Sequence, residues 1–308
     1  MTPDIILRTT NLGKKYRDRW ASQAIDLEVR RGDVFGLLGP NGAGKSTTIR
    51  MILSLIRPTA GRVELFGRDL HREREKALQK VAGIVEKPDF YLYLSAFRNM
   101  QIAGSLTLGR TPESRKVMDT LALVGLAERA LDRVKTYSHG MKQRLGIAQA
   151  LLTDPEFILL DEPTNGLDPQ GMKEVRELVR TLSMERGITI LLSSHLLNEV
   201  EQVATRMAII NRSRMVVQGE VKELLKASAN RVLFKLSPPK KSLALLSAMR
   251  TVKEPALTEE GIIANVEPKH VPAAVAALVT AGVRVHGVES RHSLEEYFLD
   301  ITSDNSEQ

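Results

Sequence analysis

The stretch Gly39-Pro-Asn-Gly-Ala-Gly-Lys-Ser46 reads GPNGAGKS and matches the pattern G-x-x-x-x-G-K-[ST] of a phosphate-binding loop. It follows an apolar run, Val34 to Leu38, and precedes a helical pattern that extends to about Ile56, just before Arg57-Pro58. A buried strand, a glycine-rich loop and a helix in this order form the context that the motif requires. The stretch therefore predicts a phosphate site on an α/β scaffold.

The residue types in this loop suit a nucleoside triphosphate. Glycines let the backbone fold tightly, so that several N–H groups and a helix N-terminus converge on one phosphate. Lys45 supplies a positive charge between the β- and γ-phosphates, and Ser46 offers a hydroxyl group to Mg²⁺. An ordinary glycine-rich turn is the alternative, and eight matching residues in the right context disfavour it. The predicted nucleotide-binding residues are Gly39, Pro40, Asn41, Gly42, Ala43, Gly44, Lys45, Ser46 and Thr47.

Two carboxylates follow a second apolar run, Phe157-Ile-Leu-Leu-Asp-Glu162. Successive residues of a strand point in opposite directions, so Asp161 and Glu162 can take different roles. We expect Asp161 to hold the coordination shell of Mg²⁺. We expect Glu162 to orient or deprotonate a water molecule in line with the γ-phosphate. Such a pair alone is usually a solvated loop, but the phosphate loop makes the catalytic interpretation stronger.

A histidine ends a third apolar run. Ile188 to Ser194 has the composition of a buried strand, and His195 follows it directly. His195 can donate a hydrogen bond to a γ-phosphate and hold the attacking water, or it can be a structural histidine. Its position alone does not separate these two roles.

The apolar runs and the patterns between them predict the domain organisation. Short branched runs separated by long helical patterns predict a parallel sheet with helices on its faces. Residues from about 90 to 152 are helical throughout, which indicates an inserted helical subdomain. The pattern changes near Gly219, so we expect a first domain at 1–222, a small α+β domain at 231–302 and a flexible tail at 303–308.

The small second domain is expected to alternate strands and helices. It contains histidines without carboxylate companions or metal-ligand spacing, so surface histidines are the default interpretation. Dimer stabilisation or regulation is the hypothesis for its role. The expected elements are strand Val232–Leu236, helix Lys241–Met249, strand Gly261–Val266, helix Val271–Ala281, strand Val283–Val288 and helix Ser293–Leu299.

Composition excludes several functional classes. The chain has no cysteine, which excludes disulfides, thiolate metal sites and cysteine nucleophiles. The start MTPDIILRTTN lacks the pattern of a signal peptide. The longest apolar run, Val271 to Val283, is shorter than the roughly 20 residues that span a bilayer. We therefore expect a chain that does not cross a membrane by itself.

The positive net charge of +7 is spread along the first part of the chain. Residues 231–308 contain 9 basic and 10 acidic residues, so the excess belongs to the first 230 residues. The signs alternate in Arg72-Glu-Arg-Glu-Lys76, as on a solvated helix face. A solvated surface is therefore favoured over a site for nucleic acid or for an anionic membrane surface.

Five motifs occur in one order: the phosphate loop, YSHGMKQR at 137–144, LLDEP at 159–163, GLDP at 166–169 and His195. This order resembles that of the ATP-binding cassette ATPases, the motor subunits of ABC transporters, over roughly the first 220 residues. The resemblance implies an α/β cassette with a mostly parallel core sheet, an N-terminal antiparallel β part and an inserted helical subdomain. It implies ATP hydrolysis, with ATP and Mg²⁺ as cofactors.

The resemblance also assigns roles to residues outside the phosphate loop. Ser138 and Gly140 would contact the γ-phosphate of ATP held by the opposite subunit, and Asp168 would lie in the loop that crosses the dimer interface. His195 would be the switch histidine. Tyr16 falls where the family places an aromatic ring against adenine, although a core or surface tyrosine is a serious alternative.

Two positions depart from the usual pattern of the family. Glu86 stands where a glutamine usually contacts Mg²⁺ and senses the membrane partner. A carboxylate can still coordinate Mg²⁺, so Glu86 stays a candidate metal ligand and catalytic residue. His139 stands between Ser138 and Gly140, where it is either tolerated or adds a positive charge near phosphate when protonated. We favour the tolerated histidine.

The resemblance implies partners as well. One subunit supplies the phosphate loop and the other the signature helix, so we expect a homodimer, or a dimer with a closely related cassette, on a separate multi-span membrane permease. The stretch GIVEKPDFY and the C-terminal region resemble the bacitracin-resistance and drug-exporter branch, which favours export. The expected location is the cytoplasmic face of the cell membrane, without nucleic acid.

The main alternative is an ABC-type ATPase that acts on ribosomes or nucleic acid. Translation-type members generally join two cassettes through a basic linker, whereas this chain has one cassette and a slightly acidic C-terminal region. A P-loop kinase or GTPase is disfavoured by the YSHGMKQR and GLDP segments.

Overall fold

The computed structural model describes residues 4–86, 88–229 and 231–290. Clustering of contacts divides the chain into two compact units, Met1–Gly219 and Glu220–Gln308. The expected helix Ser293–Leu299 and the expected tail at 303–308 lie outside the described residues. The two units are therefore described one at a time.

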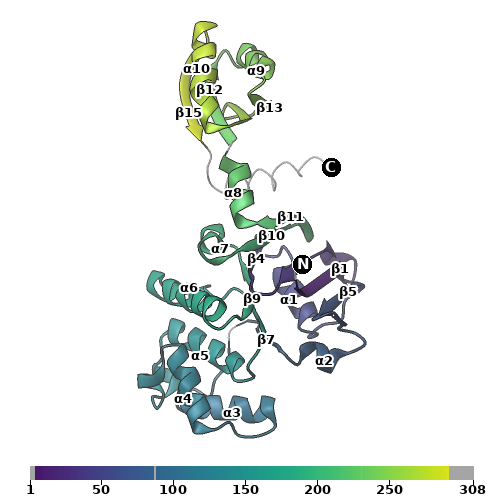
Figure 1. Ribbon diagram of the computed structural model, residues 1–308, viewed down its shortest axis with the longest axis vertical. Coiled ribbons are helices and arrows are strands. Elements are labelled where there is room, and N and C mark those ends of the chain that lie inside the picture. The colour runs from purple at the N-terminus through teal and green to yellow at the C-terminus, as the bar shows by residue number, and fades with distance from the viewer. Residues whose placement is uncertain (1–3, 87, 230, 291–308) are drawn as a thin grey trace. The chain divides into compact units, whose positions relative to one another are not determined.

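The centre of the first unit is a sheet in the strand order β11-β10-β4-β9-β8-β7 (Figure 1). The pairs β10–β4, β4–β9, β9–β8 and β8–β7 are parallel, which confirms the expected mostly parallel core sheet. Every residue of β4, β8 and β9 is buried, as is typical of parallel strands covered on both faces. The strands are β4 (Val34–Leu38), β7 (Val81–Ile84), β8 (Phe157–Leu160), β9 (Thr189–Ser194), β10 (Arg206–Asn211) and β11 (Arg214–Glu220).

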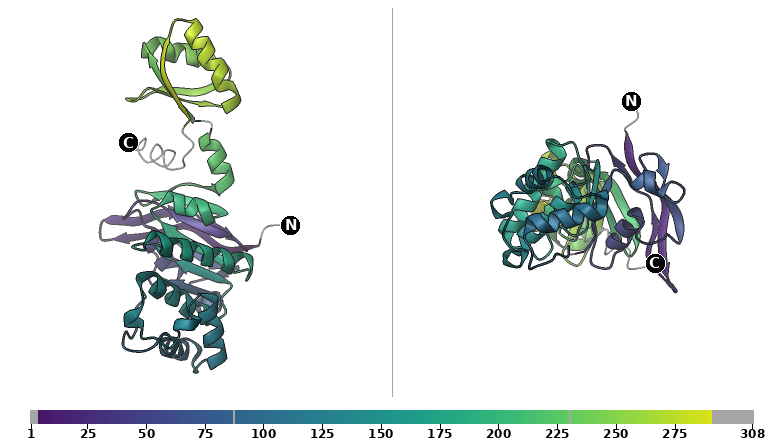
Figure 2. Two further views of the ribbon diagram at one scale, coloured as in Figure 1. Left: turned by 90° about the vertical axis from the view of Figure 1, so that its left-hand side faces the viewer. Right: turned by 90° about the horizontal axis from the view of Figure 1, so that it is seen from below.

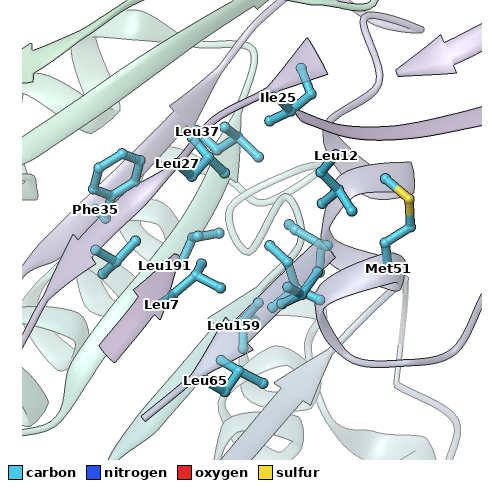
Figure 3. Close-up of a cluster of buried hydrophobic side chains, with 14 of the residues drawn as sticks. Leu7, Leu12, Ile25, Leu27, Phe35, Leu37, Met51, Leu65, Leu159 and Leu191 are labelled. Atoms are coloured by element: carbon cyan, nitrogen blue, oxygen red, sulfur yellow. The ribbon is translucent and has the colours of Figure 1, made fainter. Parts of the chain in front are cut away.

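A second sheet in the first unit confirms the expected N-terminal antiparallel part. Its order is β2-β1-β5-β6, and β3 also pairs with β1. Figure 3 shows the core that both sheets share with the first helix: Leu7 and Leu65 from this sheet lie beside Leu159 and Leu191 of the parallel sheet. Burying each such leucine contributes about 1.5–3 kcal/mol. The strands are β1 (Ile5–Tyr16), β2 (Arg19–Ile25), β3 (Glu28–Arg30), β5 (Ala60–Leu65) and β6 (Arg68–Asp69).

Helices connect and surround these strands. The helix after the phosphate loop is shorter than expected: it ends at Ile52 rather than near Ile56, because Ser54 takes a left-handed backbone conformation with φ of 56°. The helices are α1 (Lys45–Ile52), α2 (Arg74–Leu78), α3 (Ala96–Leu108), α4 (Ser114–Leu123), α5 (His139–Leu151), α6 (Pro169–Met184) and α7 (Leu197–Val203), with 3₁₀ turns η1 (Ala127–Arg129) and η2 (Val134–Thr136).

The segment between β7 and β8 is helical, with α3, α4 and α5 packed against one another. Figure 2 shows these helices, in blue to teal, at one end of the unit and apart from the purple N-terminal strands. One contact fixes the segment just before α5: the hydroxyl group of Tyr137 donates a hydrogen bond to the carbonyl oxygen of Arg129 at 2.7 Å. Tyr137 is buried, and burial raises the pKa of its phenol to about 12.

The second unit is a small α+β domain. Its sheet has the order β13-β14-β12-β15 with antiparallel pairs throughout, which is the arrangement of a ferredoxin-like β-α-β-β-α-β unit. Strand β13 was not expected from the sequence, because Pro255 and Glu254 interrupt its strand pattern. The elements are α8 (Val221–Ala229), β12 (Arg231–Ser237), α9 (Pro239–Ala248), β13 (Val252–Leu257), β14 (Ile262–Val266), η3 (Pro268–His270), α10 (Val271–Thr280) and β15 (Arg284–Ser290).

A core of aliphatic side chains and one phenylalanine holds the second unit together. Val232 and Phe234 of β12 pack with Leu246 of α9 and Leu278 of α10, and all four side chains are nearly inaccessible to solvent. None of the helices within the described residues is long and apolar enough to cross a membrane.

We predict that Tyr137→Phe lowers the free energy of unfolding by about 1 kcal/mol near neutral pH, because the hydrogen bond to Arg129 is lost while the ring stays buried. Burial also disfavours the charged phenolate and so raises the phenol pKa in the folded protein. The stability contributed by protonated Tyr137 is therefore fully present below pH 10 and is lost as the pH rises from 10 to about 12. Denaturant unfolding of wild type and variant across that range measures the difference.

Tyr93→Phe is the matched control, since the side chain of Tyr93 is largely exposed. Ultraviolet titration of the folded protein provides a second measurement. If wild type and Tyr137→Phe lose stability in parallel between pH 10 and 12, the predicted contribution of Tyr137 is wrong.

Candidate functional site

The phosphate loop leaves the central strand β4 and enters α1 through two positions that only glycine fits. A Cβ atom at Gly39 would lie 2.3 Å from the carbonyl oxygen of Ile210, and one at Gly44 would lie 2.3 Å from that of Ala21. Gly44 also has a φ of 110° directly before the first residue of α1. The backbone amides at this helix start are thereby free to face an anion.

Lys45 lies inside the loop rather than in solvent. Its side chain is 4% exposed, and its Nζ donates hydrogen bonds to the carbonyl oxygens of Gly39 at 2.7 Å and Pro40 at 3.2 Å. The same atom lies 3.1 Å from Oε1 of Glu162. The ammonium group therefore closes the loop and links it to the end of β8.

The carboxylate of Glu162 lies between two functional groups, one at the start of α1 and one directly after β9. Its Oε1 pairs with Lys45, and its Oε2 lies 2.8 Å from Nδ1 of His195. Its backbone is in the left-handed region, with φ of 49°, and its N–H donates to Oγ of Ser193 at 2.8 Å. The structure thus brings Lys45, Glu162 and His195 together.

Asp161 contacts the neighbouring strand β9 through Ser193. Its Oδ1 accepts a hydrogen bond of 2.6 Å from the hydroxyl group of Ser193, and the residue is 7% exposed. Ser193 therefore connects both carboxylates, since it donates to Asp161 and accepts from the amide of Glu162. The sequence analysis missed Ser193, although its place two residues before His195 on β9 is a usable signal.

A cavity of about 210 Å³ opens over the phosphate loop. Glu162 and Asn165 line it together with residues of the phosphate loop. Asn165 was also missed, because the loop around it carries no pattern of its own. The lining residues are Ala21, Asn41, Gly42, Gly44, Lys45, Ser46, Thr47, Glu162 and Asn165.

Tyr16 and Glu86 are among the predicted site residues that do not line this cavity. Tyr16, at the end of β1, is 49% exposed, and Nζ of Lys14 lies 5.3 Å from the centre of its ring. Glu86 forms an ion pair with Arg50 of α1. Neither Tyr16 nor Glu86 contacts the group of Lys45, Glu162 and His195 in the part of the chain that the structure describes.

Ser138 and Asp168 each cap a helix. The hydroxyl oxygen of Ser138 accepts from the amide of Met141 at 3.2 Å at the start of α5, and Oδ1 of Asp168 accepts from the amide of Gly171 at 3.0 Å at the start of α6. Gly140 faces Gly171, since a Cβ atom at Gly140 would lie 3.5 Å from its Cα. The two helix starts are therefore neighbours, and none of these residues lines the cavity over the phosphate loop.

His139 belongs to the same surface. It is exposed, and its Nε2 would lie 3.9 Å from a Cβ atom placed on Gly166, in the loop that leads to Asp168. It also lines a depression of about 340 Å³ with Phe90 and Lys142. His139 therefore lies beside the loop before α6 and not over the phosphate loop of its own chain.

A buried carboxylate that the sequence analysis missed connects three segments of the site. Glu199 on α7 is 7% exposed; its Oε2 accepts a hydrogen bond from the hydroxyl group of Thr164, and its Oε1 lies 3.2 Å from a guanidinium nitrogen of Arg176 on α6. Thr164 follows Glu162 by two residues, and Glu199 follows His195 by four. No pattern in the sequence distinguishes Glu199 from its exposed neighbours, because only packing buries it.

Comparison with known proteins gives a consistent result. A family model described as ABC transporter matches residues 22–165. An uncharacterized ABC transporter ATP-binding protein of Bacillus subtilis, YhcH, is 37% identical over 98% of this chain and 98% of its own. The bacitracin transport ATP-binding protein BcrA of Bacillus licheniformis is 38% identical over 96% of this chain and 97% of its own.

Solved structures agree on the fold of the first unit. The structure of cbiO1 from Clostridium perfringens, part of the transporter complex cbiONQ, has a TM-score of 0.66 and 29% identity, and covers 72% of this chain and 91% of its own. The dimeric post-hydrolysis structure of the cassette MJ0796 with ADP and Pi matches in fold, with a TM-score of 0.63 and 22% identity over 70% of this chain and 99% of its own.

The relatives match both units, because their similarity extends over nearly the whole chain. In this chain the phosphate loop, through Lys45, lies against Glu162, which also contacts His195. The chain belongs to the ATP-binding cassette family and is an ATP-binding, ATP-hydrolysing subunit of an ABC transporter.

Proposed function

We propose that two copies of this chain close around two ATP molecules and thereby drive a separate multi-span membrane permease in export. The observation that carries the proposal is the carboxylate of Glu162, held at the phosphate loop between Lys45 and His195. A carboxylate in that place can act on a water molecule at the γ-phosphate. The names of two relatives, which refer to bacitracin and lantibiotic transport, support the transport assignment.

In the proposed reaction, Lys45 exchanges its contact with Glu162 for the β- and γ-phosphates of ATP. The released carboxylate accepts a proton from water while the water oxygen bonds to the γ-phosphorus. The bond from that phosphorus to the bridging oxygen breaks, and ADP leaves with its electron pair. His195 contacts Glu162, and a hydrogen bond from its ring to the transferred phosphoryl group would keep the water in line.

The residues at the site fit Mg²⁺. This ion is usually held by one or two carboxylates together with substrate phosphates, and the described residues contain no self-sufficient cluster of three or more ligands. We assign the hydroxyl group of Ser46, which lines the cavity, and the carboxylate of Asp161, directly or through water, as its protein ligands. Bound Mg²⁺ neutralises charge that develops on the phosphate oxygens.

The ion pair of Glu86 supports a role other than metal binding. Because Glu86 pairs with Arg50, four residues after Ser46 on α1, a shift of the segment around Glu86 moves a residue of the phosphate-binding helix. We propose that Glu86 transmits permease contacts to α1 in this way. Coordination of Mg²⁺ by Glu86 requires this pair to break.

The dimer follows from where the remaining predicted residues lie. Ser138 and Gly140 present the start of α5, and Asp168 presents the start of α6, outside the cavity of their own chain. Helix N-termini favour phosphate, so we propose that these residues contact ATP bound by the second copy. Tyr16 is proposed to stack on adenine, since its ring is half exposed at the end of β1. In this proposal the assembly binds the permease at the cytoplasmic face of the membrane.

We predict that Glu162→Gln lowers the ATPase rate roughly one-hundred- to ten-thousand-fold, because the amide cannot accept the proton from water. ATP affinity stays within about threefold, since the phosphate loop is unchanged. Steady-state hydrolysis and equilibrium binding of a fluorescent ATP analogue measure the two quantities. Glu185→Gln, an exposed site at the end of α6, is the control. A hydrolysis rate near that of the wild type in Glu162→Gln would contradict the assignment of Glu162 as the general base.

Composite sites predict recovery of activity on mixing two inactive variants. Lys45→Ala disables the phosphate loop, and Gly140→Asp places a negative charge against the partner's phosphate. Gly140→Asp is compatible with its own fold, because a Cβ atom there has ordinary contacts and an acidic residue suits the first turn of a helix. A mixed dimer keeps one intact site.

An equimolar mixture is expected to reach roughly a quarter of the wild-type rate, because half of the dimers are mixed and each holds one intact site of two. Each variant alone is expected to be nearly inactive. The rate as a function of mixing ratio is the measurement. A mixture no more active than its components contradicts composite sites, while a single variant with wild-type activity contradicts the residue assignment alone.

We predict that Glu199 positions the catalytic segments. Glu199→Ala removes the contacts that hold Thr164 and Arg176, so kcat falls between about tenfold and a hundredfold while the Kd of ATP changes little. Glu199→Gln, which keeps one oxygen acceptor, is expected to recover part of kcat. Thr164→Val removes the hydroxyl group that donates to Glu199 and is expected to lower kcat in the same way. Thr164→Ser retains the hydroxyl group and is the control for that variant.

Thermal unfolding of the same variants separates this role from simple stability. A purely structural residue lowers Tm without a selective loss of kcat in the protein that is still folded. Equal kcat values for wild type and Glu199→Ala at a temperature where both are folded contradict the positioning role.

A further inference from the structure

A second cavity, of about 610 Å³, lies away from the phosphate loop and is larger than the cavity there. It opens between the end of α1, the segment 56–63 that leads into β5, and the segment 69–74 that leads into α2. Figure 1 shows α1, α2 and β5 on the same side of the first unit. The two cavities share no lining residue, so this one is not part of the ATP site.

Basic side chains dominate the lining of this cavity. Four arginines and one histidine contribute to it, whereas Asp69 is the single acidic residue in the lining. Oδ1 of Asp69 already accepts from the backbone amides of His71 and Arg72, at 2.9 and 3.0 Å. The basic lining residues are Arg57, Arg62, His71, Arg72 and Arg74.

Among the residues that the structure describes, most of these basic side chains form no ion pair with a carboxylate. Arg62 pairs with Glu64 at 3.3 Å, but within the described residues no acidic side chain pairs with the guanidinium group of Arg57, Arg72 or Arg74. Arg74 instead donates from Nε to the hydroxyl group of Ser54 at 2.9 Å. The unpaired guanidinium groups therefore have hydrogen-bond donors left for a ligand.

All five basic residues are exposed, and two observations distinguish their arrangement from that of widely separated surface charges. A guanidinium nitrogen of Arg57 lies 3.5 Å from Nε2 of His71, so two basic groups meet with no carboxylate between them. The lining also includes three buried apolar residues, Met51, Val63 and Leu70.

We propose that this cavity, named the Arg57 cavity, binds a phosphate-bearing anion. Planar guanidinium groups make paired hydrogen bonds to phosphate oxygens and keep their charge at every physiological pH. The volume lies in the range of cavities that hold small ligands. The anion is either a free phosphorylated small molecule or a phosphomonoester headgroup in the membrane, and both present the same chemistry.

The test compares the double variant Arg57→Gln/Arg72→Gln with Arg110→Gln/Arg115→Gln, which removes the same charge from exposed sites in the helical subdomain. All proteins carry Lys45→Ala, so that the phosphate loop does not contribute to binding. Calorimetry with inorganic pyrophosphate tests the free anion. Flotation with vesicles of three parts phosphatidylcholine to one part phosphatidic acid, and with phosphatidylserine in its place, tests the headgroup.

The proposal expects the Arg57 cavity variant to bind at least about tenfold more weakly than the control variant. Loss of pyrophosphate binding identifies a free ligand, and loss of binding only to phosphatidic acid vesicles identifies a headgroup. ATPase activity of the same charge variants with Lys45 intact should stay at the wild-type level, which confirms folding. Equal binding by both variants, or no binding of any probe by the parent protein, would overturn the proposal.

Discussion

The parallel pairing of β4 with β9, and of β9 with β8, is the constraint on which the site depends. Leu38 lies beside Ser194, and Leu160 lies beside Leu192, so the carboxyl ends of three strands meet at one edge of the sheet. The residue after each strand is then brought to the same place: the phosphate loop, the two carboxylates and His195. Lys45 and Glu162 are far apart in sequence, and this register alone explains their 3.1 Å contact.

The positions of two helix starts underlie the proposed composite sites. The helix starts at Ser138 and Asp168 are capped by their own side chains, which stabilises each helix by roughly 1 kcal/mol. Capping leaves other amides of the first turn for an anion, but these amides do not face the cavity of their own chain. In the proposed dimer, association of two copies brings a charged loop and a phosphate-favouring helix start together. Closure of the two copies is coupled to ATP binding in that proposal.

Much of this could be predicted from the sequence, because the decisive features are local. The glycines at 39 and 44, the strand composition of Phe157–Leu160 and the order of the motifs depend on near neighbours in the chain. The predicted end of α1 was wrong because the left-handed conformation of Ser54 leaves no strong signal in an apolar segment. Strand β13 was missed because its pairing with β14 overrides an interrupted pattern. The residue roles at the site stay proposals.

The phosphate loop, the mostly parallel sheet and the family can be recognised in the amino-acid sequence, since each depends on spacing that the backbone geometry requires. The side-chain contacts are visible only in the folded chain: Ser193 contacts both acidic residues, Glu199 contacts Thr164 and Arg176, and several arginines line the Arg57 cavity. These contacts depend on packing, which the sequence pattern does not reveal. A carboxylate or guanidinium group looks the same in any sequence, and its partners follow from the packing of distant segments.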